Sequence, residues 1–192
     1  QDDGNNTIAQ VCYDIAKELD VEPYDEHTGK GVLRHVIGRI GQSGWMVILV
    51  TATDYLPQHE EWVKNITNRI PQVETIVHNV NGKRTNVILG PKNNILYGDG
   101  TITDHIKDLQ FTLSPHSFFQ VNPEQTTVLY DQALEYADLK GDETVIDAYC
   151  GTGTISLFLA HKAKHVIGIE IVEPAIINAR ENAQRNGYDN TE

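Results

Sequence analysis

The residues best suited to binding chemistry lie between Asp147 and Glu170, where two carboxylates flank a glycine-rich loop. The apolar pair Val145-Ile146 predicts a short strand before Asp147, and the loop contains Gly151 and Gly153. Because glycine has no Cβ, a ligand can lie close to backbone N–H groups, and the helix start beyond the loop is electropositive. A carboxylate roughly 20 residues further on can accept hydrogen bonds from ribose hydroxyls. The pattern predicts a nucleoside-type ligand, with an ordinary glycine-rich turn as the alternative.

The elements that must position these residues follow in order along the chain. Apolar residues such as Ile155 and Phe158 predict a helix after the loop, and residues 165–169 predict a second buried strand that ends at Glu170. Ser156 stands where the dinucleotide fingerprint requires a third glycine, so a pyrophosphate site for NAD is not indicated. S-adenosylmethionine, a nucleoside ligand without phosphates, suits this loop better.

Composition limits the class of protein. The chain has 15 Lys+Arg and 27 Asp+Glu, a net charge of −12, which argues against broad non-specific binding of nucleic acid but does not exclude a local site. No apolar run approaches the roughly 20 residues of a membrane helix, and no signal sequence is recognisable. Cys12 and Cys150 are far apart in the sequence and fit no metal-ligand pattern. We therefore expect no disulfide framework, no metal site, no membrane association and a cytoplasmic location.

The chain has the features of a fragment. Its only methionine is Met46, and it stops at Glu192, one helix after the second strand of an α/β unit. A doubly wound sheet needs several more strands. We expect the complete protein to extend beyond both ends of this chain.

Residues 1–114 predict a central α+β domain with a mostly antiparallel sheet. Apolar residues at helical spacing predict a helix over residues 6–20, with Cys12 on its buried side, and a second helix is expected from about Gln58 until Pro71. Strands are expected at residues 33–40, 45–51, 75–80 and 87–89, and around Ile102 and Phe111. The first two strands form an antiparallel hairpin.

Several basic residues of this domain are candidates for phosphate contacts. A solvated sheet face is the alternative, because scattered basic residues usually have no other role. The candidates are Arg34, His35, Arg39, Lys83 and Arg84.

The composition changes near Ser114, and we place the second domain at residues 115–192. Asn122 is a good N-cap, Pro123 suits the first helical turn, and Gln125 stands where a capping-box partner would. A helix should follow to about Ala137. Its buried side is expected to carry Tyr130, Ala133, Leu134 and Ala137.

Helix propensity does not explain the segment before this helix. Phe118 and Phe119 are adjacent aromatic residues followed by the amide Gln120. The two rings could staple the helix entry to the core. An aromatic ring beside an amide is also what a site needs to stack on a flat base and to hydrogen-bond its edge.

The combination of Ser117-Phe-Phe-Gln-Val-Asn122 with Asp147-Ala-Tyr-Cys-Gly-Thr-Gly153 resembles the RNA (uracil-5-)-methyltransferase family. Members of this family make 5-methyluridine in ribosomal and transfer RNA. Residues 31–39 also resemble a strand of the family's central domain. The resemblance implies that residues 115–192 are the first half of a Rossmann-like class I methyltransferase domain, with 23S ribosomal RNA as the favoured substrate.

Site roles follow from this resemblance by position. Gln120 matches a glutamine that contacts the cofactor near the target base, and with Phe118 it would contact the substrate. Tyr149 matches the loop tyrosine, and Glu170 matches the acid on the cofactor ribose. The remaining cofactor residues implied are Gly151, Gly153 and Thr154, the last of which stands where relatives often have asparagine.

The resemblance also indicates what this chain lacks. Family members attack uracil C6 with a cysteine thiolate and remove the C5 proton with a carboxylate, and both residues would lie beyond Glu192. Cys150 is in the cofactor loop and is not that nucleophile. An iron–sulfur cluster or an RNA-binding barrel, present in some relatives, would lie before Gln1. The alternatives are a methyltransferase with another substrate and a non-catalytic RNA-binding module.

Overall fold

The computed structural model describes residues 3–192, which form two compact units. The first ends at Ile102 and the second comprises Thr103–Glu192. The sequence placed the division after Ser114. The difference concerns a hairpin of two strands, β5 (Ile102–Ile106) and β6 (Leu109–Leu113), which packs by β6 against the last helix of the second unit. Side-chain hydrogen bonds from that helix hold the strand, so packing and not composition decides to which unit it belongs.

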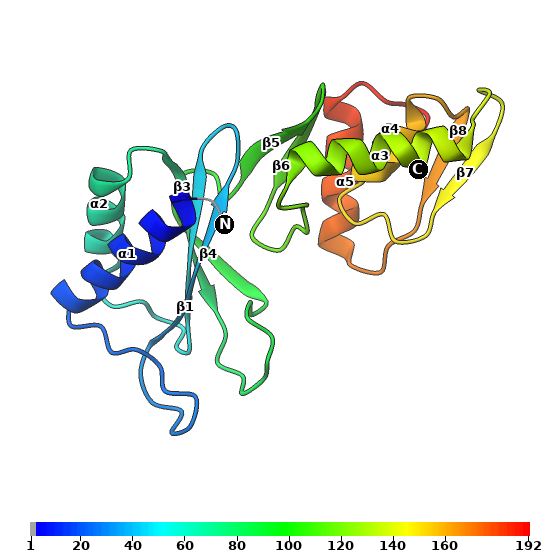
Figure 1. Ribbon diagram of the computed structural model, residues 1–192. Helices are drawn as coiled ribbons and strands as arrows, with labels where there is room; N and C mark the ends of the chain where they lie inside the picture. Colours follow the sequence, from blue (N-terminus) through cyan, green and yellow to red (C-terminus); the bar gives the residue numbers. More distant parts are fainter. Residues whose placement is uncertain (1–2) are drawn as a thin grey trace. The chain divides into compact units, whose positions relative to one another are not determined.

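The first unit is a mixed four-stranded sheet with two helices on one face (Figure 1). The strand order is β1-β2-β3-β4, with a parallel pairing between β2 and β3 and antiparallel pairings on either side. The predicted mostly antiparallel sheet is confirmed, and the helix between β2 and β3 makes the parallel crossover. Its elements are α1 (Asp3–Glu18), β1 (Leu33–Ile40), β2 (Trp45–Thr51), α2 (His59–Arg69), β3 (Val73–Val80) and β4 (Lys92–Tyr97).

The core of the first unit lies between the sheet and the two helices. Val47 and Leu49 of β2 pack there with Ile8 and Cys12 of α1 and Trp62 of α2, all fully buried or nearly so. Alternate residues of a strand face the same side, so β2 contributes every second side chain to this core. Cys12 is fully buried in this cluster, which confirms that it is a core residue, and burial raises the pKa of its thiol to about 12.

The strand predicted at residues 87–89 is wrong. Val87 and Ile88 lie in a loop with exposed fractions of 58% and 49%, and the strand that pairs with β3 is β4. The Asn81 side chain donates to the carbonyl oxygens of both Val87 and Ile88, at 2.6 and 2.9 Å. A side-chain amide therefore binds the carbonyls that a neighbouring strand would have bound.

The second unit contains a parallel pair of strands with helices packed on it (Figure 1). Tyr130 of α3 meets Phe158 of α4 edge-on, with ring centroids 5.1 Å apart. The strand, glycine loop, helix and strand predicted between Asp147 and Glu170 are confirmed. The elements after the β5–β6 hairpin are α3 (Pro123–Ala137), β7 (Thr144–Asp147), α4 (Thr154–Ala160), β8 (His165–Gly168) and α5 (Glu173–Arg185).

The start of α3 follows the sequence prediction. The Asn122 side-chain oxygen accepts a hydrogen bond from the Gln125 N–H at 3.1 Å, and Pro123 occupies the first turn. Tyr130 is buried on the inner side. Ala137 is exposed, contrary to the prediction, because α3 ends there and the chain turns at Asp138 in a left-handed conformation, with φ of 46°.

Candidate functional site

The glycine loop between β7 and α4 has one open face. Gly151 and Gly153 have φ of 54° and 84°, a left-handed region that favours glycine. Among the described residues, nothing lies within 4 Å of where a Cβ on Gly151 would be, whereas a Cβ on Gly153 would meet Ala179 of α5 at 3.3 Å. Gly153 therefore allows α4 and α5 to pack closely. Gly151 leaves space beside backbone N–H groups in which a ligand could lie.

The carboxylate of Glu170 borders this open face. Its Oε2 accepts a hydrogen bond from the Gly151 N–H at 3.1 Å, and its Oε1 accepts from the N–H groups of Ile171 and Val172 at 2.7 and 2.9 Å. The N–H groups of Val172, Ile171 and Gly151, in that order, lower the pKa of this carboxyl below its ordinary value of 4.5. Glu170 is therefore ionised at neutral pH, and its oxygens retain lone pairs for further donors.

Ser156, which stands where the dinucleotide fingerprint would have glycine, has a structural role. Its hydroxyl donates to Asp147 Oδ2 at 2.6 Å, and the side chain is buried. This bond joins the end of β7 to the first turns of α4. A glycine at position 156 could not make it, so the residue that disfavours a pyrophosphate site also fixes the carboxylate at the start of the loop.

Two of the predicted cofactor residues have contrasting surroundings. Tyr149 is 93% exposed, so its ring is available on the surface beside the loop. The Thr154 hydroxyl lies 3.0 Å from the Tyr130 hydroxyl and forms part of the contact between α3 and α4. The cofactor role carried over to Thr154 stays a prediction, and the structure shows a packing role for this side chain.

Cys150 is enclosed behind the loop. Its side chain is buried, and a Cβ on Gly168 of β8 would come within 2.9 Å of the sulfur. Burial raises the pKa of the Cys150 thiol, and the nearby carboxylates of Asp147 and Glu170 raise it further. A thiol in these surroundings stays protonated, which disfavours nucleophilic attack.

The two phenylalanines before α3 point to different surroundings. The ring of Phe119 packs against Phe111 of β6, with centroids 5.7 Å apart, whereas Phe118 is 75% exposed. The staple interpretation therefore fits Phe119 and leaves Phe118 free to contact a ligand. Gln120 is partly buried and, within the described residues, makes no hydrogen bond to Gly151 or Glu170.

The open face at Gly151 does not belong to the nearby cavity of the second unit. A cavity of about 270 Å³ lies between β8 and α5, where Val166, Ala183 and Tyr188 contribute to its walls. Of the predicted cofactor residues, Gly153 alone lines this cavity in the part of the chain that the structure describes. The cavity is thus separate from the carboxylate of Glu170.

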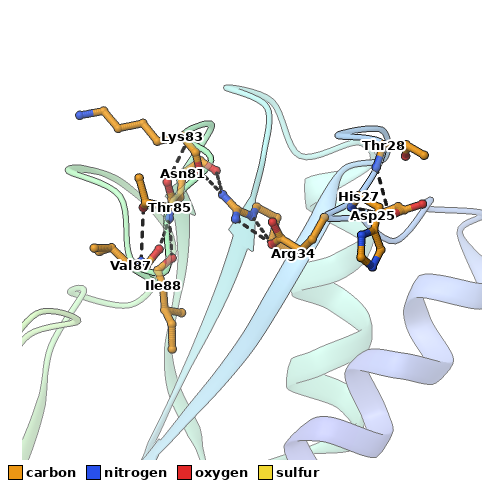
Figure 2. A network of polar contacts seen from close by, with 10 residues as sticks. Asp25, His27, Thr28, Arg34, Asn81, Lys83, Thr85, Val87 and Ile88 are labelled. Carbon is orange, nitrogen blue, oxygen red and sulfur yellow. Dashed lines mark hydrogen bonds and ion pairs between the residues drawn. The ribbon is translucent and has the colours of Figure 1, made fainter.

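Arg34, a predicted phosphate contact, is instead a clamp between two loops of the first unit (Figure 2). Its side chain is only 1% exposed. The guanidinium donates to Glu26 at 2.7 Å and to the carbonyl oxygens of Asn81 and Lys83 at 2.7 and 2.8 Å. It also lies over the Tyr24 ring, 4.7 Å from its centroid. These contacts hold the guanidinium inside the protein, so the prediction for Arg34 is wrong.

The other basic candidates differ in exposure. His35 is partly buried, and burial followed by the charge of Arg34 lowers its pKa, so it is neutral at pH 7. Arg39 is also partly buried, which lowers its pKa. Lys83 and Arg84 are exposed. Figure 2 shows the Lys83 ammonium pointing away from the Arg34 network, and Arg84 donates to the Thr28 carbonyl at 3.1 Å. Lys83 is thus the best placed to meet a phosphate.

Residues 3–192 contain no group of three or more His, Cys, Asp or Glu side chains that could hold a metal ion. Within the same residues, no helix is long and apolar enough to cross a membrane.

The comparisons with known proteins agree with this geometry. A family model described as a methyltransferase domain matches residues 139–192. An uncharacterised RNA methyltransferase of Halalkalibacterium halodurans is 51% identical over 194 residues, covering 100% of this chain and 42% of the relative. One from Clostridium acetobutylicum is 49% identical over 196 residues, with the same coverage. The chain is homologous to part of these RNA methyltransferases. It spans less than half the length of the curated relatives it matches, and the resemblance to RNA methyltransferases found in the sequence is confirmed.

Solved structures extend the comparison to the fold. The tRNA (uracil-54, C5)-methyltransferase of Pyrococcus abyssi, in complex with S-adenosyl-L-homocysteine, has a TM-score of 0.78 and 27% identity. The match covers 95% of this chain and 44% of that one. A tRNA m1G37 methyltransferase of M. jannaschii has a TM-score of 0.53 and 14% identity. The match covers 94% of this chain and 50% of that one, and at this identity it shows a shared fold alone.

One residue that binds the glycine loop was not predicted from the sequence. Asn182 of α5 is fully buried, and its amide donates to the Thr152 carbonyl at 3.0 Å. A polar residue in the buried part of a helix is unusual unless it is hydrogen-bonded. Asparagines recur at every fourth position, at Asn178 and Asn182 of α5 and at Asn186, its C-cap, and this spacing was the signal available in the sequence.

The anchored carboxylate predicts a pH dependence of stability. Because the folded state lowers the pKa of Glu170, the stabilisation is complete above the unfolded value of about 4.5 and is lost as pH falls through the folded pKa. We expect Glu170→Gln to lower the melting temperature at neutral pH and to converge with the parent chain in acid. Scanning calorimetry across this range measures the difference, with Glu181→Gln, an exposed residue of α5, as control. A pH-independent difference would contradict the anchoring role.

Proposed function

We propose that the protein containing this chain transfers a methyl group from S-adenosylmethionine to C5 of uracil in RNA, with 23S ribosomal RNA as the favoured substrate. This chain would supply the central domain and the first half of the catalytic domain. The observation that carries the proposal is the open face at Gly151 bordered by the ionised Glu170. It occurs in a chain that resembles a tRNA uracil methyltransferase bound to S-adenosylhomocysteine.

The residues of the loop fit a nucleoside with a ribose and no phosphate. The Glu170 oxygens would accept hydrogen bonds from ribose hydroxyls, and a side chain at position 151 would fill the space that the ligand needs. Tyr149, exposed beside the loop, would contact the same ligand. When bound, the cofactor supplies an electrophilic methyl group. Gln120 and Phe118, on the segment before α3, would contact the cofactor and the target base.

The methyl transfer itself would need residues outside this chain. Uracil C5 is a weak nucleophile toward a sulfonium methyl until a thiolate has added to C6, and the C5 proton must leave after transfer to restore the double bond and release the thiolate. Cys150 is buried, and its pKa is raised. It would also have to reach past the cofactor to the far face of the base. We assign the thiolate and the base to the sequence beyond Glu192.

RNA would meet a surface of the first unit through a few cations. The chain carries a net charge of −12, so any contact must be local. Lys83 is on a loop that Arg34 and Asn81 hold in place, and its ammonium extends from that loop (Figure 2). That RNA is the partner of this protein, and that the protein is cytoplasmic, stay predictions. A methyltransferase acting on another substrate is the second candidate, which the methyl-transfer experiment separates.

The cofactor assignment predicts a loss of affinity in Glu170→Ala. Removing charge-assisted hydrogen bonds to the ribose should weaken the binding of S-adenosylhomocysteine, raising its dissociation constant roughly 10- to 100-fold. Titration calorimetry on the complete protein measures it, with Glu181→Ala as the matched control on α5. An unchanged constant refutes the role of Glu170, and binding of NAD in place of S-adenosylhomocysteine overturns the choice of cofactor.

The mechanism predicts that residues 1–192 alone do not methylate RNA. Without the thiolate that activates C5, positioning of the cofactor is insufficient. Incorporation of labelled methyl groups into unmodified ribosomal and transfer RNA should occur with the complete protein and not with this chain. Mapping the product to 5-methyluridine tests the uracil assignment. Turnover by residues 1–192 near the rate of the complete protein would contradict the assignment of the nucleophile, and methylation of a non-RNA substrate would favour the second candidate.

The surface assignment predicts a modest, sequence-independent effect of Lys83→Ala on RNA affinity. Loss of one phosphate contact should reduce the slope of log affinity against log salt by about 0.7–0.9. Filter binding of the complete protein to ribosomal RNA fragments at several salt concentrations measures the slope. Lys64→Ala, an exposed lysine of α2, is the control. Equal slopes for both variants would remove Lys83 from the interface.

A further inference from the structure

Three asparagines form a row along α5 that faces β6. Asn186 Oδ1 accepts from the Gln110 N–H at 2.8 Å, and its amide donates to the Gln110 carbonyl at 2.7 Å. One turn earlier, Asn182 Oδ1 accepts from the Thr112 N–H at 2.8 Å. The side chains thus bind the edge of β6 that faces away from β5, where a further strand would otherwise pair.

The geometry of helix and strand explains the spacing of this asparagine row. Four residues of an α-helix rise about 6 Å, and two residues of a strand rise about 6.6 Å. Asparagines at every fourth helical position therefore meet every second residue of a strand that runs antiparallel to the helix. Continuing the row, the Oδ1 of Asn178 accepts hydrogen bonds from the hydroxyls of Ser114 and Ser117, at 3.4 and 3.2 Å. Ser117 directly precedes the Phe-Phe-Gln segment.

Asn182 differs from its neighbours in the row because one of its partners lies in the glycine loop. Its Nδ2 donates to the carbonyl of Thr152, at 3.0 Å, between the two glycines of the loop. One fully buried amide therefore joins β6 to the cofactor loop. Asparagine is a poor helix former, and burying its amide is costly unless both ends are paired. Both ends are paired here, which is the expected arrangement if the residue holds the two segments together.

We propose that Asn182 is a positioning residue that holds the glycine loop and β6 in one frame, and that the asparagine row extends this frame to the Phe-Phe-Gln segment. The inference rests on the proposed function for its consequence. Gly151 and Glu170 would receive the cofactor, and Gln120 and Phe118 would reach it from the segment fixed by Asn178. Loss of Asn182 would therefore loosen the loop without removing any group that touches the cofactor.

The matched pair of variants is Asn182→Ala and Asn186→Ala. Both remove an asparagine of the same row from β6, and only the first removes the bond to the Thr152 carbonyl. Amide hydrogen exchange, resolved by NMR, is expected to rise on the order of 10-fold at Gly151 and Gly153 in Asn182→Ala relative to Asn186→Ala. In the complete protein, Asn182→Ala should raise the KM for S-adenosylmethionine by a similar factor with a smaller change in kcat, and Asn186→Ala should not.

The outcomes separate this inference from the proposed function. Equal loop exchange in the two variants overturns the positioning role whatever the protein binds. Faster loop exchange in Asn182→Ala, together with no binding of S-adenosylhomocysteine by the parent protein, supports the positioning role and refutes the cofactor. If Asn182→Ala does not fold, Asn182→Leu keeps most of the side-chain volume and removes the same bonds, with Asn186→Leu as its matched control. In the unmodified protein, S-adenosylhomocysteine should slow exchange at Thr112 more than at Gln110, and equal effects would contradict the coupling.

Discussion

The parallel pairing of β7 with β8 is the constraint on which the candidate site depends. It places Asp147 opposite Gly168, so that both strand ends and the loops after them meet at one edge. The Glu170 carboxylate then reaches the Gly151 N–H, and the Ser156 hydroxyl reaches Asp147. Two paired strands that pack against α4 therefore bring a carboxylate and an open glycine face together.

Side-chain amides replace backbone pairing in both units. In the first unit, the amides of Asn79 and Asn81 bind backbone groups of the loop before β4, including Gly90 and Val87. In the second unit, the asparagine row on α5 binds the outer edge of β6. An asparagine side chain carries the same donor and acceptor as a peptide group, so it can satisfy a strand edge or an irregular loop where no strand is available. Backbone groups that no strand pairs with are thereby hydrogen-bonded.

The charges of the chain are arranged around these fixed loops. The buried guanidinium of Arg34 forms an ion pair with Glu26 and donates hydrogen bonds to backbone carbonyls, so it serves the fold. Lys83, on the loop whose carbonyls Arg34 binds, keeps its ammonium on the surface (Figure 2). A basic residue close to another in space can thus have an unrelated role, and burial decides which. An acidic protein can in this way present a cation at a defined place, which suits a substrate that is recognised locally.

The sequence by itself determined the strand, glycine loop, helix and strand around the site, the cap at Asn122 and the core position of Cys12. These depend on interactions between residues near one another in the chain, such as the bond from the Gln125 N–H to Asn122, and on the periodicity of apolar side chains. Tertiary structure alone decided the clamp role of Arg34, the loop in place of a strand at residues 87–89, and the bond from Asn182 to Thr152. The partners in these contacts are far apart in sequence or compete with a locally favoured strand. Which donor meets which acceptor is fixed only when the packed elements bring them together.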